Sequence, residues 1–475
     1  MCLGVLLVLL PAAARADMGV MIADPTTVGA SAFTHAGHAL VYLTGVCADT
    51  PVRARLCRTG ENGSVVTRYP KFHESSSYGW NIVPIELYLE GSMRPGERLL
   101  YGSQNVRDAL ASKARDGFMK DVCSGACPIV AHSYWRDMVA ATITRDIFVF
   151  AVKTDTTQDE KTVEWLNAQE NVDRYNGVTN NCATFVKDLI NVIFPHSVHR
   201  DVINDIGMMT PKAAAHSFTS WAQRQRDLGF YIMHFSQKPG SIARSGVASS
   251  GTETAIHMKK YLIAAAMIGD HEVAGSFFVA YWLTGRFGLY KEYVRHSTPR
   301  LTELERTHQA QKETGGPAEL RLIEAEIETN ETQTTGTDAE WTSYRQRFTA
   351  MREAAAPSDD AWKTVLKRLD RGTISVDGNG DTWAVPEKDT RRVGISNRIV
   401  LAEGSDPQLA LQLMAWRVGF ALSAKKRMRP GIVEFREDWA LFERAYAQMH
   451  PTVMIAGADE DGKAATSYAA GAAER

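Results

Sequence analysis

The most constraining feature of this sequence is the order of its segments, because β-prone runs come first and an amphipathic helix follows them. The runs are residues 31–47, 64–72, 81–89 and 145–155. In the first run, His38, Leu40 and Tyr42 alternate with the residues between them, as in a strand. Residues 158–175 are helical in pattern, and a second helix is expected from near Cys182 to a stop at Pro195. This order predicts a mixed α/β unit.

The length of 475 residues is too great for one compact core, so more than one domain is expected. The pattern predicts a first domain over residues 17–235, a linker rich in Gly and Ser at 236–255, a mainly helical region over 256–455 and a disordered tail at 456–475. The clearest helix of the C-terminal region is expected to start at Asp406, which is followed by Pro407.

The first residues resemble an export signal. Residues 3–10 form an apolar core, and Ala14-Arg15-Ala16 is an A-x-A cleavage site. We therefore expect residues 1–16 to be a signal peptide and the mature protein to be periplasmic or secreted. The alternative is an apolar N-terminal strand.

Charge and hydropathy limit the classes of partner. The formal net charge of -2 gives no basic footprint, so no nucleic-acid partner is expected. Residues 258–290 contain two apolar stretches that are interrupted by charged residues and are too short to span a bilayer. They are interpreted as a buried helical hairpin, with a lipid-facing surface helix, and hence peripheral membrane contact, as the alternative.

The cysteines of an exported protein tend to form disulfides. Removal of the signal removes Cys2 and leaves five cysteines. Cys47 is close in sequence to Cys57, and Cys123 to Cys127, so each of these pairs can form a bridge, although the sequence does not prove the connectivity. Cys182 is then left over as a thiol that is either reactive or intermolecular.

Cys182 has the surroundings of a nucleophile. Asn180 and Asn181 are good N-cap residues, which place the cysteine in the first turn of a helix, where the dipole and free N–H groups favour a thiolate. A histidine is then needed as proton partner, and His38 on the first strand is favoured over His35 because of the strand register. The alternative is that Cys182 is a small buried residue and His38 a structural one.

"TNNCATFVKDLI" after Tyr175, with "HAGHALVYL" far upstream, resembles the circularly permuted branch of the NlpC-type papain-like thiol enzymes. The order of His before Cys, with a β-prone run and a helix between them, is most similar to the periplasmic domain of Lnb-type lipoprotein N-acyltransferases. Lecithin retinol acyltransferase-like proteins are similar more distantly. The resemblance covers roughly residues 25–215 and implies an α+β fold: a permuted papain-like domain whose antiparallel sheet packs on the Cys-bearing helix, before a mainly helical region.

The resemblance also implies roles for individual residues. Cys182 is the nucleophile and His38 the general base and acid, while Tyr175 and Asn181 are assigned to the substrate or oxyanion site, with Asn181 shaping the turn. The third polar group, which orients the histidine in such enzymes, has three weak candidates. They are Glu61, His73 and Asn81.

No cofactor and no metal site are expected. Residues 196–201 are interpreted as a solvated loop rather than a metal site that uses both of its histidines. Residues 377–383 begin like a calcium loop, but Thr382 and Lys388 stand where the loop needs Gly and Glu, so a polar turn is the better interpretation.

The function expected from these observations is an exported, cysteine-dependent acyl-transfer enzyme. It would be an acyltransferase or a hydrolase of esters or amides, acting through a thioester on Cys182. Its substrate would be a lipid or a cell-wall peptide. The alternatives are a peptidoglycan-directed amidase or peptidase, and a non-catalytic envelope binding protein that keeps the fold.

Overall fold

The computed structural model describes the chain in nine ranges, with isolated residues between them. These are residues 16–26, 36–68, 79–120, 137–172, 179–201, 208–251, 287–298, 333–355 and 359–451. The chain forms two compact units. The first comprises Met1–Gly96, Leu110–Lys238 and Ile242–Thr335, and the second comprises Glu97–Ala109, Pro239–Ser241 and Gly336–Arg475. Helix α3 (Gln104–Asp116) contributes residues to both units.

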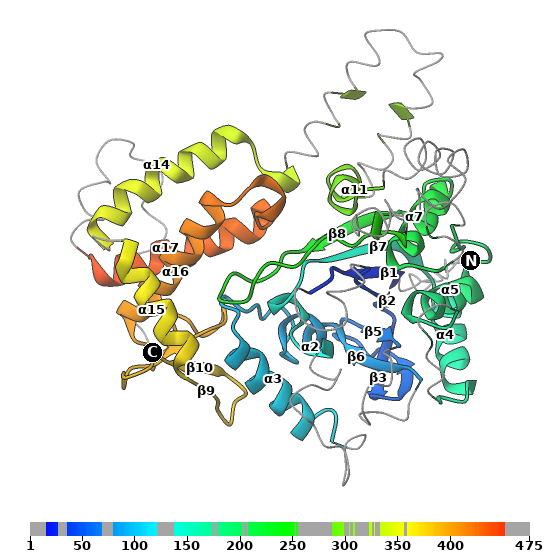
Figure 1. Ribbon diagram of the computed structural model, residues 1–475, viewed down its shortest axis with the longest axis horizontal. Coiled ribbons are helices and arrows are strands. Elements are labelled where there is room, and N and C mark those ends of the chain that lie inside the picture. Colours follow the sequence, from blue (N-terminus) through cyan, green and yellow to red (C-terminus); the bar gives the residue numbers. More distant parts are fainter. Residues whose placement is uncertain are drawn as a thin grey trace, which may run out of the picture. The chain divides into compact units, whose positions relative to one another are not determined.

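The first unit is built on a six-stranded sheet (Figure 1). In spatial order its strands are β6 (Asn81–Pro84), β5 (Ser64–Thr67), β2 (His38–Leu43), β1 (Ala16–Ala23), β7 (Ile147–Thr154) and β8 (Tyr231–Phe235). Every neighbouring pair is antiparallel. The expected α+β class, with an antiparallel sheet, is therefore confirmed.

Strand β1 lies in the middle of this sheet, between β2 and β7. The sequence pattern predicted no strand there, because "ADMGVMIA" is buried on both faces and shows no alternation of polar and apolar residues. Gly19 allows the close packing of β1 on β7, because a Cβ atom at this position would lie 1.9 Å from the carbonyl oxygen of Phe150.

Helices pack on the sheet. On one face lie α4 (Thr156–Ala168), α5 (Cys182–Ile193) and α7 (Pro211–Ala222), grouped on one side of the sheet in Figure 1. Helix α2 (Ile85–Glu90) packs on β5 and β6, and the 3₁₀ helix η2 (Ala141–Ile143) packs on α2. Helix α11 (Leu289–His296) packs on β8, and the 3₁₀ helix η3 (Arg226–Leu228) precedes β8.

The first unit's core shows how α5 meets the sheet. Ala39 and Val41 of β2 belong to one buried cluster with Cys182 and Phe185 of α5. Because successive side chains of a strand point to opposite faces, His38 and Leu40 leave β2 on the other face. Helix α5 is therefore seated on β2, with its first turn at the beginning of that strand.

The predicted strand over residues 81–89 is correct only for its first half. Strand β6 ends at Pro84, which is the N-cap of α2. Proline has no N–H group to continue a ladder, and it is well tolerated where a helix begins. The apolar run that follows is therefore helical, and it ends at Gly91, whose φ of 71° is left-handed.

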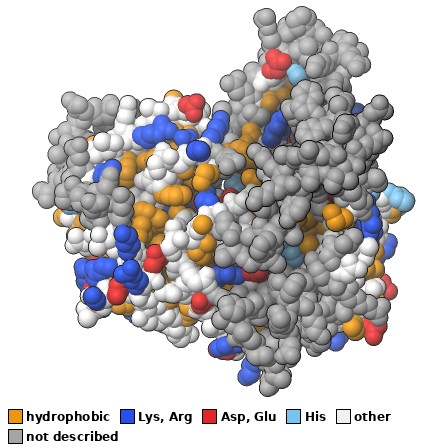
Figure 2. Space-filling view, in the orientation of Figure 1, with side chains coloured by type: hydrophobic (Ala, Val, Ile, Leu, Met, Phe, Trp, Pro, Cys, Tyr) orange, Lys and Arg blue, Asp and Glu red, His pale blue; other side chains and the backbone are white. Residues whose placement is uncertain are grey.

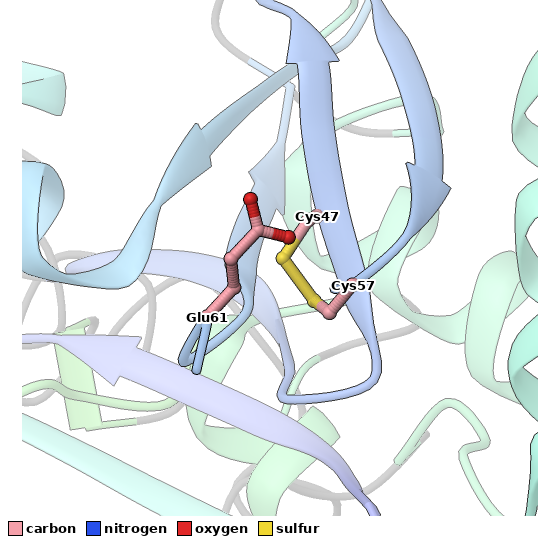
Figure 3. A group of neighbouring side chains, drawn as sticks. All are labelled: Cys47, Cys57 and Glu61. Carbon is pink, nitrogen blue, oxygen red and sulfur yellow. A yellow bond between two sulfur atoms is a disulfide. The ribbon is translucent and has the colours of Figure 1, made fainter. Parts of the chain in front are cut away.

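A small hairpin of β3 (Val46–Thr50) and β4 (Arg53–Leu56) carries the Cys47–Cys57 disulfide, with a Cα–Cα distance of 4.9 Å. This predicted pair is confirmed, and it is compatible with an exported protein. Glu61 lies beside it, so its carboxylate and the two sulfurs are within 4.8 Å of one another (Figure 3). Since the sulfurs are bonded to each other, they are not thiolate ligands for a metal.

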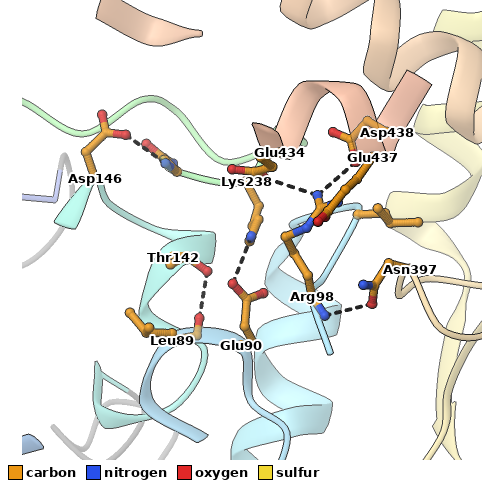
Figure 4. Close-up of polar contacts among 12 residues, drawn as sticks. Leu89, Glu90, Arg98, Thr142, Asp146, Lys238, Asn397, Glu434, Glu437 and Asp438 are labelled. Atoms are coloured by element: carbon orange, nitrogen blue, oxygen red, sulfur yellow. Dashed lines mark hydrogen bonds and ion pairs between the residues drawn. The ribbon is translucent and has the colours of Figure 1, made fainter. Parts of the chain in front are cut away.

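The predicted linker at 236–255 does not separate two domains. Gln237 donates from its backbone to Asp146 at 2.7 Å, and Ala248 donates to Asp24 at 3.0 Å. Lys238 forms a buried ion pair with Glu90 at 2.8 Å (Figure 4). Small residues gave this segment the composition of a linker, but its backbone N–H groups have acceptors in the first unit, which itself continues to Thr335.

The second unit is mainly helical, as expected. Its helices are α14 (Asp338–Ala355), α15 (Asp359–Arg371), α16 (Pro407–Ser423), the 3₁₀ helix η4 (Lys426–Met428) and α17 (Ile432–Met449). A three-stranded sheet accompanies them, formed by β9 (Thr373–Val376), β10 (Thr382–Val385) and β11 (Val393–Gly394). On the face shown in Figure 2, hydrophobic side chains of this unit lie among Lys and Arg side chains.

Two sequence expectations for the second unit are confirmed. Helix α16 starts after Asp406, whose carboxylate accepts the Leu409 N–H at 2.9 Å. Residues 377–383 form a polar turn, in which the Asp377 carboxylate accepts two backbone N–H groups, each at 2.9 Å.

Buried ion pairs connect α16 with α17. Arg417, which interrupts the apolar face of α16, pairs with Asp438 at 2.6 Å and with Glu434 at 2.9 Å. Arg98 of the same unit also binds both acids, as Figure 4 shows.

Several expectations fall outside the described residues. They are the signal core, the Cys123–Cys127 pair, the apolar segment at 258–286 and the tail from residue 456. In the part of the chain that the structure describes, no helix is both long enough and apolar enough to cross a bilayer.

Candidate active site

Helix α5 begins at Cys182 because Asn181 caps it. The Asn181 side-chain oxygen accepts the Thr184 N–H at 2.9 Å, and its amide group donates to the Met209 carbonyl at 2.9 Å. Phe185 and Leu189 are buried on the predicted apolar face. Both ends of the Asn181 amide are thus engaged, so this residue shapes the turn before Cys182.

The Cys182 thiol is the only free cysteine among the residues that the structure describes, and it is buried. Backbone N–H groups of Ala39, Ala183 and Cys182 itself face the sulfur and favour the thiolate, but burial is the larger effect and raises the thiol pKa. The expected lowering of this pKa is therefore wrong. The N–H groups at the start of α5 lower the Cys182 pKa, as predicted, but desolvation raises it by more.

His38 is the first residue of β2 and follows Gly37, whose φ of 75° is left-handed. A Cβ atom at Gly37 would lie 2.6 Å from the Ala23 carbonyl oxygen, so this position needs glycine. Burial, with the nearby cation of Arg145, lowers the His38 pKa well below its usual value. The imidazole is therefore neutral at pH 7.

Thr67 determines which imidazole nitrogen of His38 carries the proton. Its hydroxyl donates to the Ala39 carbonyl at 3.1 Å, which uses its single hydrogen. The same oxygen lies 2.6 Å from Nε2 of His38, and it must accept in that contact. The ring proton is therefore on Nε2, and Nδ1 carries the basic lone pair.

The sulfur contacts the peptide group that joins His38 to Ala39. Of the three N–H groups that face Sγ of Cys182, the one from outside α5 belongs to Ala39, whose nitrogen forms the peptide bond with His38. The two side chains approach this peptide from different faces of β2. The fold thus brings Cys182, from far along the chain, to the residue next to His38.

Thr67 was not predicted as the third polar group. It ends the β-prone run "SVVT", and alternation places it on the His38 face of β5, which is the signal that could have identified it. The candidate Asn81 lies opposite Thr67 in the register, and its buried Oδ1 accepts no hydrogen bond. Glu61 pairs instead with Arg55 at the surface, at 2.6 Å.

Three candidate residues lie outside the described residues. They are Tyr175, His35 and His73. Their assigned roles remain predictions. Of the 196–201 segment, Asp201 lies 3.8 Å from His216, and His199 is exposed.

We expect replacement of Thr67 by Val to destabilise the protein by about 1–3 kcal/mol, because it leaves the His38 N–H and the Ala39 carbonyl buried without partners. Chemical denaturation measures this loss. Thr67→Ser keeps the hydroxyl and is the matched control. A Val variant as stable as the Ser variant would contradict the assigned hydrogen bonds.

No family model and no curated protein matches this chain. Among solved structures, it is similar to the crystal structure of the type VI secretion system effector TseH. The identity is 14%, the match covers 46% of this chain and 92% of that chain, and the TM-score is 0.22. A likeness this weak supports no inference about function.

Proposed function

We propose that the first unit is a cysteine-dependent acyl-transfer enzyme that acts on an ester or an amide through a thioester on Cys182. One observation carries the proposal: the sulfur lies against the peptide N–H next to His38, whose ring proton is held on Nε2 by Thr67. In this tautomer the basic nitrogen is Nδ1, and it is the atom that we propose takes the thiol proton. Thiol, base and orienting group are the three parts of an activated nucleophile.

The first step starts from a neutral thiol and a neutral imidazole, because burial disfavours both charged forms. For this step the imidazole of His38 has to turn to the face of β2 on which the sulfur lies. Its Nδ1 then takes the thiol proton as sulfur bonds to the substrate carbonyl carbon, and the carbonyl electron pair moves to oxygen. Backbone N–H groups around the sulfur, those of Ala39, Cys182 and Ala183, stabilise the negative charge.

The tetrahedral intermediate then collapses. The bond from carbon to the leaving oxygen or nitrogen breaks, and the leaving group takes the proton from His38. The thioester on Cys182 remains. Water gives hydrolysis and an amine gives acyl transfer, and in each case His38 accepts the proton of the attacking group and returns one to sulfur.

The compartment and substrate are proposed on the sequence features together with the disulfide. The signal-like residues 1–16 and the Cys47–Cys57 bridge support a periplasmic or secreted protein. A lipid or a cell-wall peptide is the proposed substrate. An acyltransferase of the Lnb type and a peptidoglycan-directed amidase or peptidase share the same thioester chemistry and differ in the acyl group that Cys182 carries.

A non-catalytic envelope protein that keeps the fold is the second candidate, and one observation favours it. Cys182 and His38 are only 6% and 8% exposed as whole residues. A substrate must reach the sulfur past the groups that cover it, whereas a structural cysteine needs no access.

Trapping of the covalent intermediate separates these candidates. The protein is mixed with p-nitrophenyl palmitate or with a muropeptide digest, quenched in acid and analysed by intact and peptide mass spectrometry. We expect an acyl adduct on Cys182 and none in Cys182→Ala. A palmitoyl adduct supports lipid acyl transfer, and a peptidyl adduct supports the amidase or peptidase. Absence of any adduct, or an equal adduct in the Ala variant, contradicts the enzyme and favours the binding protein.

A further inference from the structure

Arg68 contacts three segments around the start of α5. Its Nη1 donates to the Asn180 side-chain oxygen, and its Nε donates to the Gly79 carbonyl at 2.9 Å. Its guanidinium carbon lies 5.1 Å from the centre of the Phe185 ring, which is three residues into α5 beyond Cys182. A planar guanidinium can meet two acceptors and an aromatic face at once, and a lysine cannot.

The position of Arg68 in the chain gives these contacts a function. Arg68 follows Thr67, the residue that binds the His38 ring, and Asn180 lies two residues before Cys182. Consecutive residues at the end of β5 therefore hold the base and the turn that carries the nucleophile. A movement of the turn before Cys182 relative to His38 therefore changes the contacts of Thr67 or Arg68.

The charge of Arg68 is costly at this place. A cation at the N-terminus of a helix is disfavoured by the dipole. Cation–π contact with Phe185 offsets part of this cost. The contacts of Arg68 lie at the turn before the helix whose first N–H groups, those of Cys182 and Ala183, favour the Cys182 thiolate.

We infer that Arg68 is a positioning residue of the reaction, which holds the turn before Cys182 in register with His38 through Asn180 and Gly79. The inference rests on the proposed function of Cys182 and His38. Arg68 acts in this role through Asn180 and Gly79.

The test compares Arg68→Met, Arg68→Lys, Asn180→Ala and the Arg68→Met/Asn180→Ala double variant, with p-nitrophenyl butyrate as substrate. We expect kcat to fall by about 10–100-fold in Arg68→Met with little change in KM, because misplacement by about 1 Å has effects of this size. Asn180→Ala should lose a similar factor. The double variant should lose no more than Arg68→Met alone, because both changes break one interaction.

The pH dependence of Cys182 alkylation by iodoacetamide is the second measurement, and it needs no turnover. Arg68→Met should move the rise in alkylation rate to higher pH, because the turn shifts and the N–H groups of Cys182 and Ala183 no longer face the sulfur as closely. Arg68→Lys, which cannot make both hydrogen bonds of Arg68, should move it in the same direction. Arg55→Met is the control, since Arg55 makes a comparable pair with Glu61 at the surface. It should match the wild type in both measurements.

Failure of the proposed function and failure of the inference about Arg68 give different results. If the wild type neither turns over the ester nor forms an adduct on Cys182, the proposed function fails. The alkylation profiles still show in that case whether Arg68 holds the turn before Cys182. If Arg68→Met lowers only the thermal midpoint, with kcat and the alkylation profile of the folded protein unchanged, Arg68 is merely structural. Additive losses in the double variant would also overturn the inference.

Discussion

Replacement of His38 by Gln is expected to lower the rate of Cys182 acylation by about 10²–10⁴-fold at pH 7, the usual range for loss of a general base. Gln fills a similar volume but takes no proton from the thiol. The rate of p-nitrophenolate release from p-nitrophenyl butyrate in the pre-steady state measures this step. The matched control is His199→Gln, because His199 is an exposed histidine in the loop after α5.

The pH dependence of the His38 variant distinguishes a base from a structural histidine. The lowered His38 pKa keeps the wild-type imidazole neutral, so its rate should be flat near neutral pH and fall only in acid. Without the base, the rate follows the thiolate fraction and rises about tenfold per pH unit until the raised Cys182 pKa is reached. The two profiles should converge at high pH. Parallel profiles would exclude His38 as the base.

Replacement of Asp24 by Asn is expected to stabilise the protein increasingly as the pH rises from about 4 to about 8. Asp24 is buried at the end of β1, accepts the Ala248 N–H at 3.0 Å and lies near Asp146. Burial, with the Asp146 charge, raises its pKa from 3.8 to about 8, although Arg145 and Lys212 act in the opposite direction.

The sign of this effect follows from proton binding. Between pH 4 and pH 8 the folded protein keeps the Asp24 proton and the unfolded chain releases it, so the stability of the wild type falls as pH rises. At about 1.4 kcal/mol per pKa unit, the loss approaches about 5 kcal/mol across this window. The asparagine of the variant has no proton to release, and its side-chain oxygen can still accept the Ala248 N–H.

Urea denaturation at pH 5 and pH 8 measures the difference between the wild type and Asp24→Asn. Asp227→Asn, at an exposed aspartate, is the control and should change stability by less than about 0.5 kcal/mol at either pH. A constant difference between wild type and Asp24→Asn at the two pH values would show that Asp24 is ionised in the folded protein.

The local features of the site were predictable because a few neighbouring residues encode them. Asn181 caps the helix at Cys182, and the apolar face of α5 carries Phe185 and Leu189 as predicted. The short spacing of Cys47 and Cys57 indicated their disulfide. Caps, helical periodicity and short loops each act over about ten residues or fewer, so the pattern of residues shows them directly.

The partners of the site were not predictable in the same way. Strand β1 has no alternation, because both of its faces are buried by segments far along the chain. Nothing in the local sequence marks Thr67 as a partner of His38. The pairing of β2 with β5 brings the two side chains together. Pairing of this kind is set by the register of a whole sheet, not by local preference.

The sequence by itself determined that a helix begins at Cys182, that His38 belongs to a β-prone run and that Cys47 and Cys57 are close enough in sequence to form a bridge. Only the tertiary structure decided that the thiol pKa is raised and not lowered, that Thr67 holds the ring proton of His38 and that Arg68 binds the turn before Cys182. The physical reason is that desolvation and hydrogen-bond partners depend on what surrounds a group in space, and those surroundings come from residues that are distant in the chain.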